Sequence, residues 1–192
     1  MYFLTVKNFV VFVALICTLT PIKIYANESA WQALRDGKAV AIMRHAIAPS
    51  GVDNSALTRE ACKGERNLSQ QGRDQAIRIG EIFRANDIVN AKVYTSSLCR
   101  CVDTAELLAF NSPSLLNAIN AFYPDRSSAP KQTVELKQWI KQQITQSEST
   151  NILVTHGFNV TELTGEFASQ GEFLIIAMDG DGVVVMHHEK VD

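Results

Sequence analysis

Two short apolar runs that each end at a histidine constrain the fold of this chain more than any other feature. Residues 39–43 (AVAIM) are followed by Arg44-His45, and residues 151–155 (NILVT) are followed by His156. Apolar runs of this length are typical of buried strands in a parallel sheet. Because ligands bind at the carboxyl ends of such strands, we predict that both histidines lie at one binding edge. The adjacent arginine indicates an anionic ligand.

The composition restricts the number of domains and the partners. The chain has 192 residues, of which 46% are hydrophobic and 20% charged, the profile of a single globular domain. The net charge is −2, so the molecule as a whole has no electrostatic attraction for nucleic acid or an anionic membrane. An anion site must therefore be local.

The N-terminal segment differs in character from the rest of the chain. A basic residue, Lys7, precedes an apolar run at 9–19, and a small residue, Ala26, stands at the end of the segment. This pattern predicts a signal peptide at residues 1–26, cleaved after Ala26, and a domain at 27–192. An uncleaved anchor is the alternative, but the run is shorter than the ~20 residues that span a bilayer. The mature protein is predicted to be periplasmic or secreted, without a membrane span.

An extracytoplasmic location changes how the cysteines are interpreted. The predicted mature chain keeps Cys62, Cys99 and Cys101. In an oxidising compartment, Cys62 is expected to pair with either Cys99 or Cys101, which leaves one free thiol. The alternative is that all three are small buried apolar residues.

The order of predicted elements favours an α/β fold. Periodicity and turn signals predict the following elements: a helix at 28–35, strand 38–43, helix 69–85, strand 91–95, a helix from 96–97 to 108, a short strand at 115–119, helix 133–144, strand 151–155, a brief helix to 165, and a hairpin of 172–178 and 183–186. We therefore predict one three-layer α/β/α domain, whose open sheet is mostly parallel and ends in a C-terminal antiparallel hairpin.

The loops after the three clear strands carry two arginines and two histidines. Arg100 falls in the first turn of the helix after the second strand and joins Arg44, His45 and His156. Guanidinium groups bind two phosphoryl oxygens at once. An imidazole can attack phosphorus if a carbonyl holds its other nitrogen. The set predicts phosphoryl chemistry.

Four motifs in order resemble the histidine phosphatase superfamily, also called phosphoglycerate mutase-like, and in particular its small exported bacterial branch. They are Arg44-His45, Leu68-Ser69-x-x-Gly72-x-x-Gln75-Ala76, Ser96-Ser97-x-x-x-Arg100-x-x-x-Thr104-Ala105, and His156-Gly157. The resemblance covers nearly all of the predicted mature chain.

The resemblance implies a role for each matching residue. His45 would form a phosphohistidine, Arg44 and Arg100 would hold the phosphoryl oxygens, and His156 would complete the pocket. Water would then hydrolyse the intermediate, with no metal or other cofactor. The expected partner is a small phosphorylated substrate, and the expected activity is phosphate monoester hydrolysis. The alternative is a non-catalytic relative that binds phosphate or sugar phosphates. A histidine-based metal site is disfavoured because the arginines would repel a cation.

The chain departs from the family pattern at two points. Ala46 replaces the glycine that usually follows the nucleophile, which matters only if that position needs a positive φ. The general acid is the second point. Asp125 is our first candidate and Glu162 its rival, while a phosphoramidate or acid anhydride substrate would need no strong acid.

Other polar residues have weaker assignments. Asn159 is placed to donate to phosphate or to cap a helix. Arg59, Arg66 and Arg126 form either a basic rim or ordinary surface charges. His187-His188, on the last strand, is expected to be solvated or exposed at a sheet edge.

Overall fold

The computed structural model describes residues 22–51, 53, 62–123 and 125–191. The elements are α1 (Ile22–Arg35), β1 (Val40–Arg44), α2 (Gln70–Ala85), β2 (Lys92–Thr95), α3 (Cys99–Leu107), β3 (Ser114–Leu115), the 3₁₀ helix η2 (Asn117–Ile119), α4 (Ala129–Gln146), β4 (Asn151–Thr155), α5 (Gly157–Thr164), β5 (Phe173–Asp179) and β6 (Gly182–Glu189). The predicted α/β fold is confirmed.

The strands form one mixed sheet in the order β3-β2-β4-β1-β5-β6. The first four strands in that order are parallel, and β5 and β6 add the predicted antiparallel hairpin. The register pairs Arg44 at the end of β1 with Thr155 at the end of β4. His45 and His156 therefore leave the sheet at the same level, as the two apolar runs predicted.

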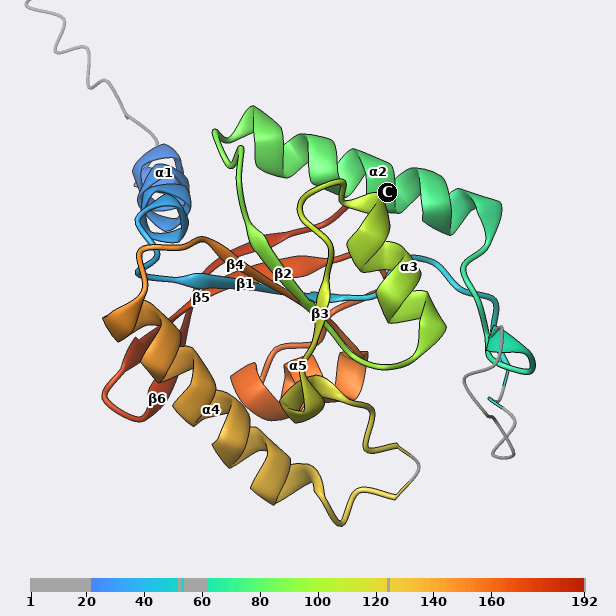
Figure 1. The fold of residues 1–192 in the computed structure, drawn as a ribbon. Helices are drawn as coiled ribbons and strands as arrows, with labels where there is room; N and C mark the ends of the chain where they lie inside the picture. The colour runs from blue at the N-terminus through green and yellow to red at the C-terminus, as the bar shows by residue number, and fades with distance from the viewer. Residues whose placement is uncertain (1–21, 52, 54–61, 124, 192) are drawn as a thin grey trace, which may run out of the picture.

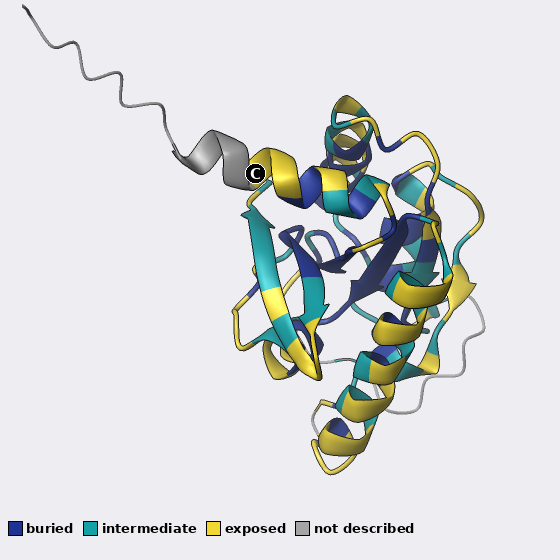
Figure 2. Cartoon of the chain, turned by 90° about the vertical axis from the view of Figure 1, so that its left-hand side faces the viewer, coloured by how far each residue is buried: buried dark blue, intermediate teal, exposed yellow. Residues whose placement is uncertain are grey.

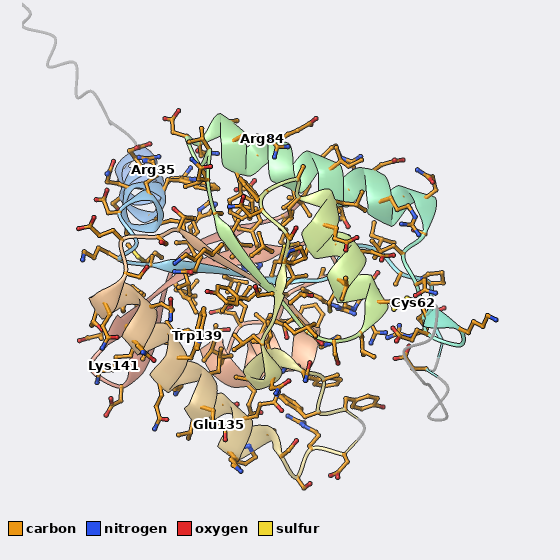
Figure 3. The ribbon with its side chains drawn as sticks, in the orientation of Figure 1. Arg35, Cys62, Arg84, Glu135, Trp139 and Lys141 are labelled. Atoms are coloured by element: carbon orange, nitrogen blue, oxygen red, sulfur yellow. A yellow bond between two sulfur atoms is a disulfide. The ribbon has the colours of Figure 1, made fainter. Side chains whose placement is uncertain are left out.

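Helices cover both faces of the sheet (Figure 1). Alternating residues of β1 point to opposite sides: Ala41 and Met43 pack with α1, α2 and α3, whereas Val40 and Ile42 pack with α4 and α5. Trp139, labelled in Figure 3, packs from α4 onto Tyr94 of the sheet, with ring centroids 4.7 Å apart. Figure 2 shows the buried residues concentrated in the central strands.

One local prediction was wrong, and another held only in part. Residues 115–119 were predicted as a strand, but β3 ends at Leu115 and η2 follows. Here Asn120 donates to the Asn117 side chain as well as to its carbonyl oxygen, a local bonding pattern that competes with a strand. His187 and His188 do lie on the edge strand β6, but both are half-buried, because Glu189 and Glu172 pair with them at 2.8 and 3.1 Å.

The predicted signal peptide lies mostly outside the described residues, and α1 begins at Ile22, before the predicted cleavage point. None of the helices in the described part of the chain is long and apolar enough to cross a membrane.

Candidate active site

The two histidines at the strand ends meet face to edge. Their ring centroids lie 5.7 Å apart, and both side chains are buried, His45 with 2% exposure. The backbone N–H of His45 donates to the carbonyl oxygen of Thr155 at 2.9 Å, which continues the β1–β4 ladder beyond the last paired residues. The parallel pairing of the two strands therefore fixes the relative position of the two rings.

The hydrogen bonds of His45 define its tautomer. Its Nδ1 lies 2.8 Å from the carbonyl oxygen of Ala46, so Nδ1 carries the proton and donates. Its Nε2 then has a free electron pair, which accepts a hydrogen bond from Nε of Arg100 at 3.2 Å. Burial lowers the pKa of His45 to about 3. The hydrogen bond to Ala46 opposes this shift, and the charges of Arg100 and Arg44 add to it. The ring is therefore neutral at physiological pH.

His156 is held by side chains from the segment after β2 and from α3. Its Nε2 lies 2.8 Å from Oγ of Ser96, and Sγ of Cys101 lies 3.6 Å from the same nitrogen. Burial, and then the neighbouring His45 and Arg100, keep the pKa of His156 well below its usual value. Burial also raises the pKa of the Cys101 thiol to about 12, so this sulfur stays protonated. The pocket thus contains two neutral imidazoles.

The two predicted arginines supply the positive charge. Arg100 is buried at the start of α3, and its Nη1 donates to Asp53 at 2.9 Å. Arg44 bonds through Nη1 to the carbonyl oxygen of Ala168 at 3.3 Å. A Cβ on Gly157 would lie 3.3 Å from Cδ of Arg44, so the missing side chain gives Arg44 room to lie against α5. Both guanidiniums face one cavity.

That cavity has a volume of about 470 Å³. It is lined by the four predicted residues together with Asp53, Arg66, Leu98, Ala121, Tyr123, Arg126, Gly157, Phe158, Thr161 and Phe167. The described lining includes four arginines and one carboxylate, although the whole chain has a net charge of −2. Positive side chains are therefore concentrated at this cavity, and Arg66 and Arg126 are among them.

The loop after β1 is held by the second and third motifs. A Cβ at Gly72 would lie 2.0 Å from the carbonyl oxygen of Ile47, so only glycine lets α2 approach this loop. Gln75 accepts from the N–H of Ile47 at 3.1 Å, and Oγ1 of Thr104 accepts from the N–H of Ala46 at 3.0 Å. Ala46 is not among the described residues with positive φ, so this position does not require glycine.

A disulfide joins the next part of this loop to α3. Cys62 pairs with Cys99, with a Cα–Cα distance of 5.9 Å, and Cys101 is the free buried thiol. Figure 3 labels Cys62 beside α3. The carboxylate of Glu65 also accepts from the N–H of Cys99 at 2.6 Å. Of the two predicted pairings of Cys62, the one with Cys99 is therefore the one that forms. The cross-link lies next to Arg100.

Asp53 is a site residue that sequence reasoning missed. Its Oδ1 accepts from Arg100 and, at 2.9 Å, from the N–H of Arg66. Burial opposes ionisation of Asp53, but the Arg66 N–H and the Arg100 charge outweigh it and hold the pKa below its ordinary value. Asp53 is therefore a carboxylate that positions Arg100. It lies in a polar loop without periodicity, so the sequence offers no signal for this contact.

Three predicted residues do not come to the cavity. Asp125 is exposed and accepts from the N–H of Ser127, and Glu162 pairs with Arg126 at 3.1 Å. Neither lines the cavity. Asn159 is buried, but its amide donates to the carbonyl oxygen of Asn120 at 2.9 Å. Arg59 lies outside the described residues. Among the described residues, no group of three or more His, Cys, Asp or Glu side chains is placed to hold a metal ion.

The structure thus brings two buried imidazoles and two guanidiniums together at one edge of an α/β sheet. Residues 40–119 match the sequence model of the histidine phosphatase superfamily (branch 1), which confirms the family resemblance. No curated protein sequence matches the chain significantly.

Several solved structures share the fold, two of them phosphatases. The protein histidine phosphatase SixA complexed with tungstate is 17% identical, with a TM-score of 0.56 over 78% of this chain and 95% of that one. A mycobacterial glucosyl-3-phosphoglycerate phosphatase complexed with VO3 is 12% identical, with a TM-score of 0.55 over 77% and 96%. YhfR from Bacillus stearothermophilus is 18% identical, with a TM-score of 0.51 over 77% and 94%. Family and fold together support phosphatase function in general.

Proposed function

We propose that this protein hydrolyses phosphate monoesters or related phosphoryl compounds through a phosphohistidine on His45, without a metal ion. The observation that carries the proposal is the bonding of His45. Its Nδ1 is held by the Ala46 carbonyl while its Nε2 faces Arg100 across 3.2 Å. A neutral imidazole with one nitrogen fixed in this way is an activated nucleophile. Two of the fold relatives are complexed with the oxyanions tungstate and VO3, which is consistent with a pocket for phosphoryl groups.

In the first step, Nε2 of His45 bonds to phosphorus and the bond from phosphorus to the leaving group breaks. The leaving atom takes the electron pair. Arg44 and Arg100 bind the non-bridging oxygens. The Arg100 N–H that donates to Nε2 in the free site then donates to one of these oxygens instead. Guanidiniums fixed in this way supply the charge stabilisation that metal ions supply in other phosphoryl transfers.

In the second step, a water oxygen bonds to phosphorus, the P–N bond breaks, and its electron pair returns to Nε2. One proton of the water leaves to solvent, and inorganic phosphate is released. Nδ1–H keeps its bond to the Ala46 carbonyl throughout. His156, which is fixed by Ser96, completes the phosphoryl pocket as a neutral partner.

Protonation of the leaving group is the step that this pocket supports least. Asp53 is ionised at neutral pH, and Asp125 and Glu162 point elsewhere. We therefore propose that the preferred substrates, such as phosphoramidates or acid anhydrides, have leaving groups that need little protonation.

We also propose that the protein is exported. The N-terminal pattern at residues 1–26 is that of a signal peptide, and a Cys62–Cys99 disulfide suits an oxidising compartment. Fractionation of cells that express the full chain, with N-terminal sequencing of the product, tests both the location and cleavage after Ala26. Recovery in the cytosol with residues 1–26 intact would overturn this part of the proposal.

Hydrolysis of p-nitrophenyl phosphate by the purified protein, with and without EDTA, tests the central proposal. We expect turnover that EDTA does not change and that His45→Ala lowers by at least about 10³-fold. His187→Gln is the matched control, since it removes an imidazole outside the cavity. Rapid quenching should also trap acid-labile phosphate on the wild type and not on His45→Ala. Phosphate binding without any turnover would favour the non-catalytic alternative instead.

A further inference from the structure

The cavity has a second wall that the phosphoryl chemistry does not use. Tyr123 and Phe158 stack with ring centroids 5.0 Å apart and an interplanar angle of 11°. Phe167 also lines the cavity, and Leu98 and Ala121 are its other apolar neighbours there. The three rings come from the loop after η2, the first turn of α5 and the segment after α5.

The rings of this aromatic wall are unusually exposed. Tyr123 is 63% exposed and Phe167 66%, although each has a large apolar surface. An apolar patch at the mouth of a binding cavity is a typical ligand contact. The guanidinium of Arg126 lies over the Phe158 ring, 5.3 Å from its centroid, and Glu162 holds it there. The Phe158 ring therefore has neighbours on α5 and on the connection between η2 and α4.

The cavity is also larger than one phosphoryl group requires. Its volume of about 470 Å³ is in the range of pockets that hold whole small molecules. The charged residues Arg44 and Arg100 share this space with the aromatic wall, so a single bound molecule contacts both. Its phosphoryl group would lie at the histidines, and its leaving group would lie against the rings.

The ionised state of Asp53 points to the same kind of substrate. An aryl oxygen or a ring nitrogen leaves more easily than an alkoxide, because its conjugate acid is stronger. A pocket whose described carboxylate is held ionised by Arg66 and Arg100 suits such a leaving group. The rings and the carboxylate are separate observations, and both favour an aromatic leaving group.

We infer that the substrate of this site has a planar aromatic leaving group, with phosphorus bonded to the ring directly or through one atom, and that Tyr123, Phe158 and Phe167 form its subsite. This inference rests on the proposed phosphatase function only where it describes the ring as a leaving group. The binding preference exists whether or not the bound molecule is cleaved. Stacking on such a wall distinguishes flat rings from aliphatic groups of the same size.

Binding of non-hydrolysable phosphonates tests the subsite without requiring turnover. Calorimetry on the full protein should show benzylphosphonate binding at least about 10-fold more tightly than ethylphosphonate, and several-fold more tightly than cyclohexylmethylphosphonate. Equal affinity for the benzyl and ethyl compounds would overturn the inference. Equal affinity for the benzyl and cyclohexylmethyl compounds would overturn its aromatic part.

Ring-removing variants locate the effect. Phe158→Leu and Tyr123→Leu should each lower the benzyl-to-ethyl preference by about 3- to 10-fold, while the affinity for inorganic phosphate changes little. Phe110→Leu is the matched control, because that ring also has an arginine over it, Arg84 at 5.6 Å, but lies outside the cavity. A loss of preference in Phe110→Leu equal to that in Phe158→Leu would contradict the subsite.

Turnover then tests how close the ring of the substrate lies to phosphorus. If the protein is a phosphatase, kcat/KM should be higher for O-phosphotyrosine, whose ring bonds the phosphate oxygen, than for adenosine 5′-monophosphate, whose ring is separated by a ribose. The opposite order would overturn the placement of the ring next to phosphorus. Absence of all turnover, together with the expected phosphonate preference, would overturn the phosphatase proposal and leave the subsite intact.

Discussion

The two ends of the cavity are built in different ways. At the inner end, His45, Arg100 and His156 are buried and project from strand ends or a helix start in a hydrogen-bonded arrangement. At the outer end, Tyr123 and Phe167 are largely exposed and come from connecting segments. The inner end has the geometry that the proposed chemistry requires, and the outer end has the surface that the proposed recognition requires.

The difference follows from what holds each end in place. The inner groups are fixed by the β1–β4 register, by the Ala46 carbonyl and by Asp53. The outer rings contact mainly each other and Arg126. Side chains on connecting segments tolerate change better than side chains on buried strand ends. Substitutions at the inner end should therefore affect catalysis strongly, and those at the outer end should affect selectivity.

Among substitutions that keep both histidines, Arg100→Lys should have the largest effect. An ammonium group cannot contact His45, Asp53 and a phosphoryl oxygen together, as the Arg100 guanidinium can. We expect kcat/KM for p-nitrophenyl phosphate to fall by about 10²- to 10³-fold. The same exchange at the outer end, Arg126→Lys, should cost less than about 5-fold.

Arg73→Lys controls for the loss of a guanidinium far from the site, since Arg73 pairs with Asp103 outside the cavity. Its kcat/KM should match the wild type. Equal losses in Arg100→Lys and Arg126→Lys would contradict the distinction between the two ends.

Removal of the Cys62–Cys99 disulfide should weaken the inner end through its scaffold. The bond closes a loop with a sequence separation of 37, for which chain entropy predicts a loss of about 3–4 kcal/mol in the free energy of unfolding. Urea titration of Cys62→Ala/Cys99→Ala measures this loss. Because Cys99 precedes Arg100, kcat/KM should also fall, while the benzyl-to-ethyl phosphonate preference should not.

A reductant separates the disulfide from the other effects of these substitutions. It should destabilise the wild type toward the level of the double variant and leave the double variant unchanged. A double variant as stable and as active as the wild type would show that the cross-link does not support the inner end.

The buried imidazole of His45 should make the folded protein acid-sensitive. The pKa of His45 is about 3 when folded and near 6.5 when unfolded, so between these values the unfolded chain binds more protons. Stability therefore falls as pH falls below about 6.5. For this single group, the loss between pH 7 and pH 5 is about 2 kcal/mol.

Urea unfolding of the wild type and His45→Asn at pH 7, 6 and 5 isolates this contribution. The wild type should lose stability more steeply than the variant, although both share the other titrating groups. Identical slopes would mean that His45 is not held neutral by the inner end. NMR of the His45 ring, which should not titrate between pH 5 and 8, checks the same point directly.

The inner end could be predicted from the sequence because its residues follow strong local signals. Apolar runs locate the strand ends, and Ser69 caps α2 by accepting from the N–H of Gly72. Parallel pairing then brings His45 and His156 together wherever the two strands are neighbours. These features depend on periodicity and capping, which are properties of a few adjacent residues.

The remaining features depend on contacts between distant segments. Asp53 meets Arg100 across 47 residues, and neither segment signals the other. The sequence left the disulfide partner of Cys62 undecided between Cys99 and Cys101. These two residues lie on different sides of α3: Cys101 is fully buried beside His156, whereas Cys99 bonds to Cys62. The choice of Asp125 as acid assumed that its loop covers the pocket, but its carboxylate bonds to Ser127 instead.

Gly157→Ala should give the smallest effect and should separate stability from activity. A Cβ there would lie 3.3–3.4 Å from Cδ, Nε and Nη1 of Arg44, so that side chain would shift by a few tenths of an ångström. Alanine at the start of α5 favours the helix, so the free energy of unfolding should stay equal or rise by up to about 1 kcal/mol. The shifted guanidinium should lower kcat/KM by about 3- to 10-fold. Because the aromatic wall is untouched, the benzyl-to-ethyl phosphonate preference should persist. A variant with unchanged kcat/KM would show that Arg44 is not positioned by its contact with α5, and the inner end would then be less tightly fixed than its hydrogen bonds indicate.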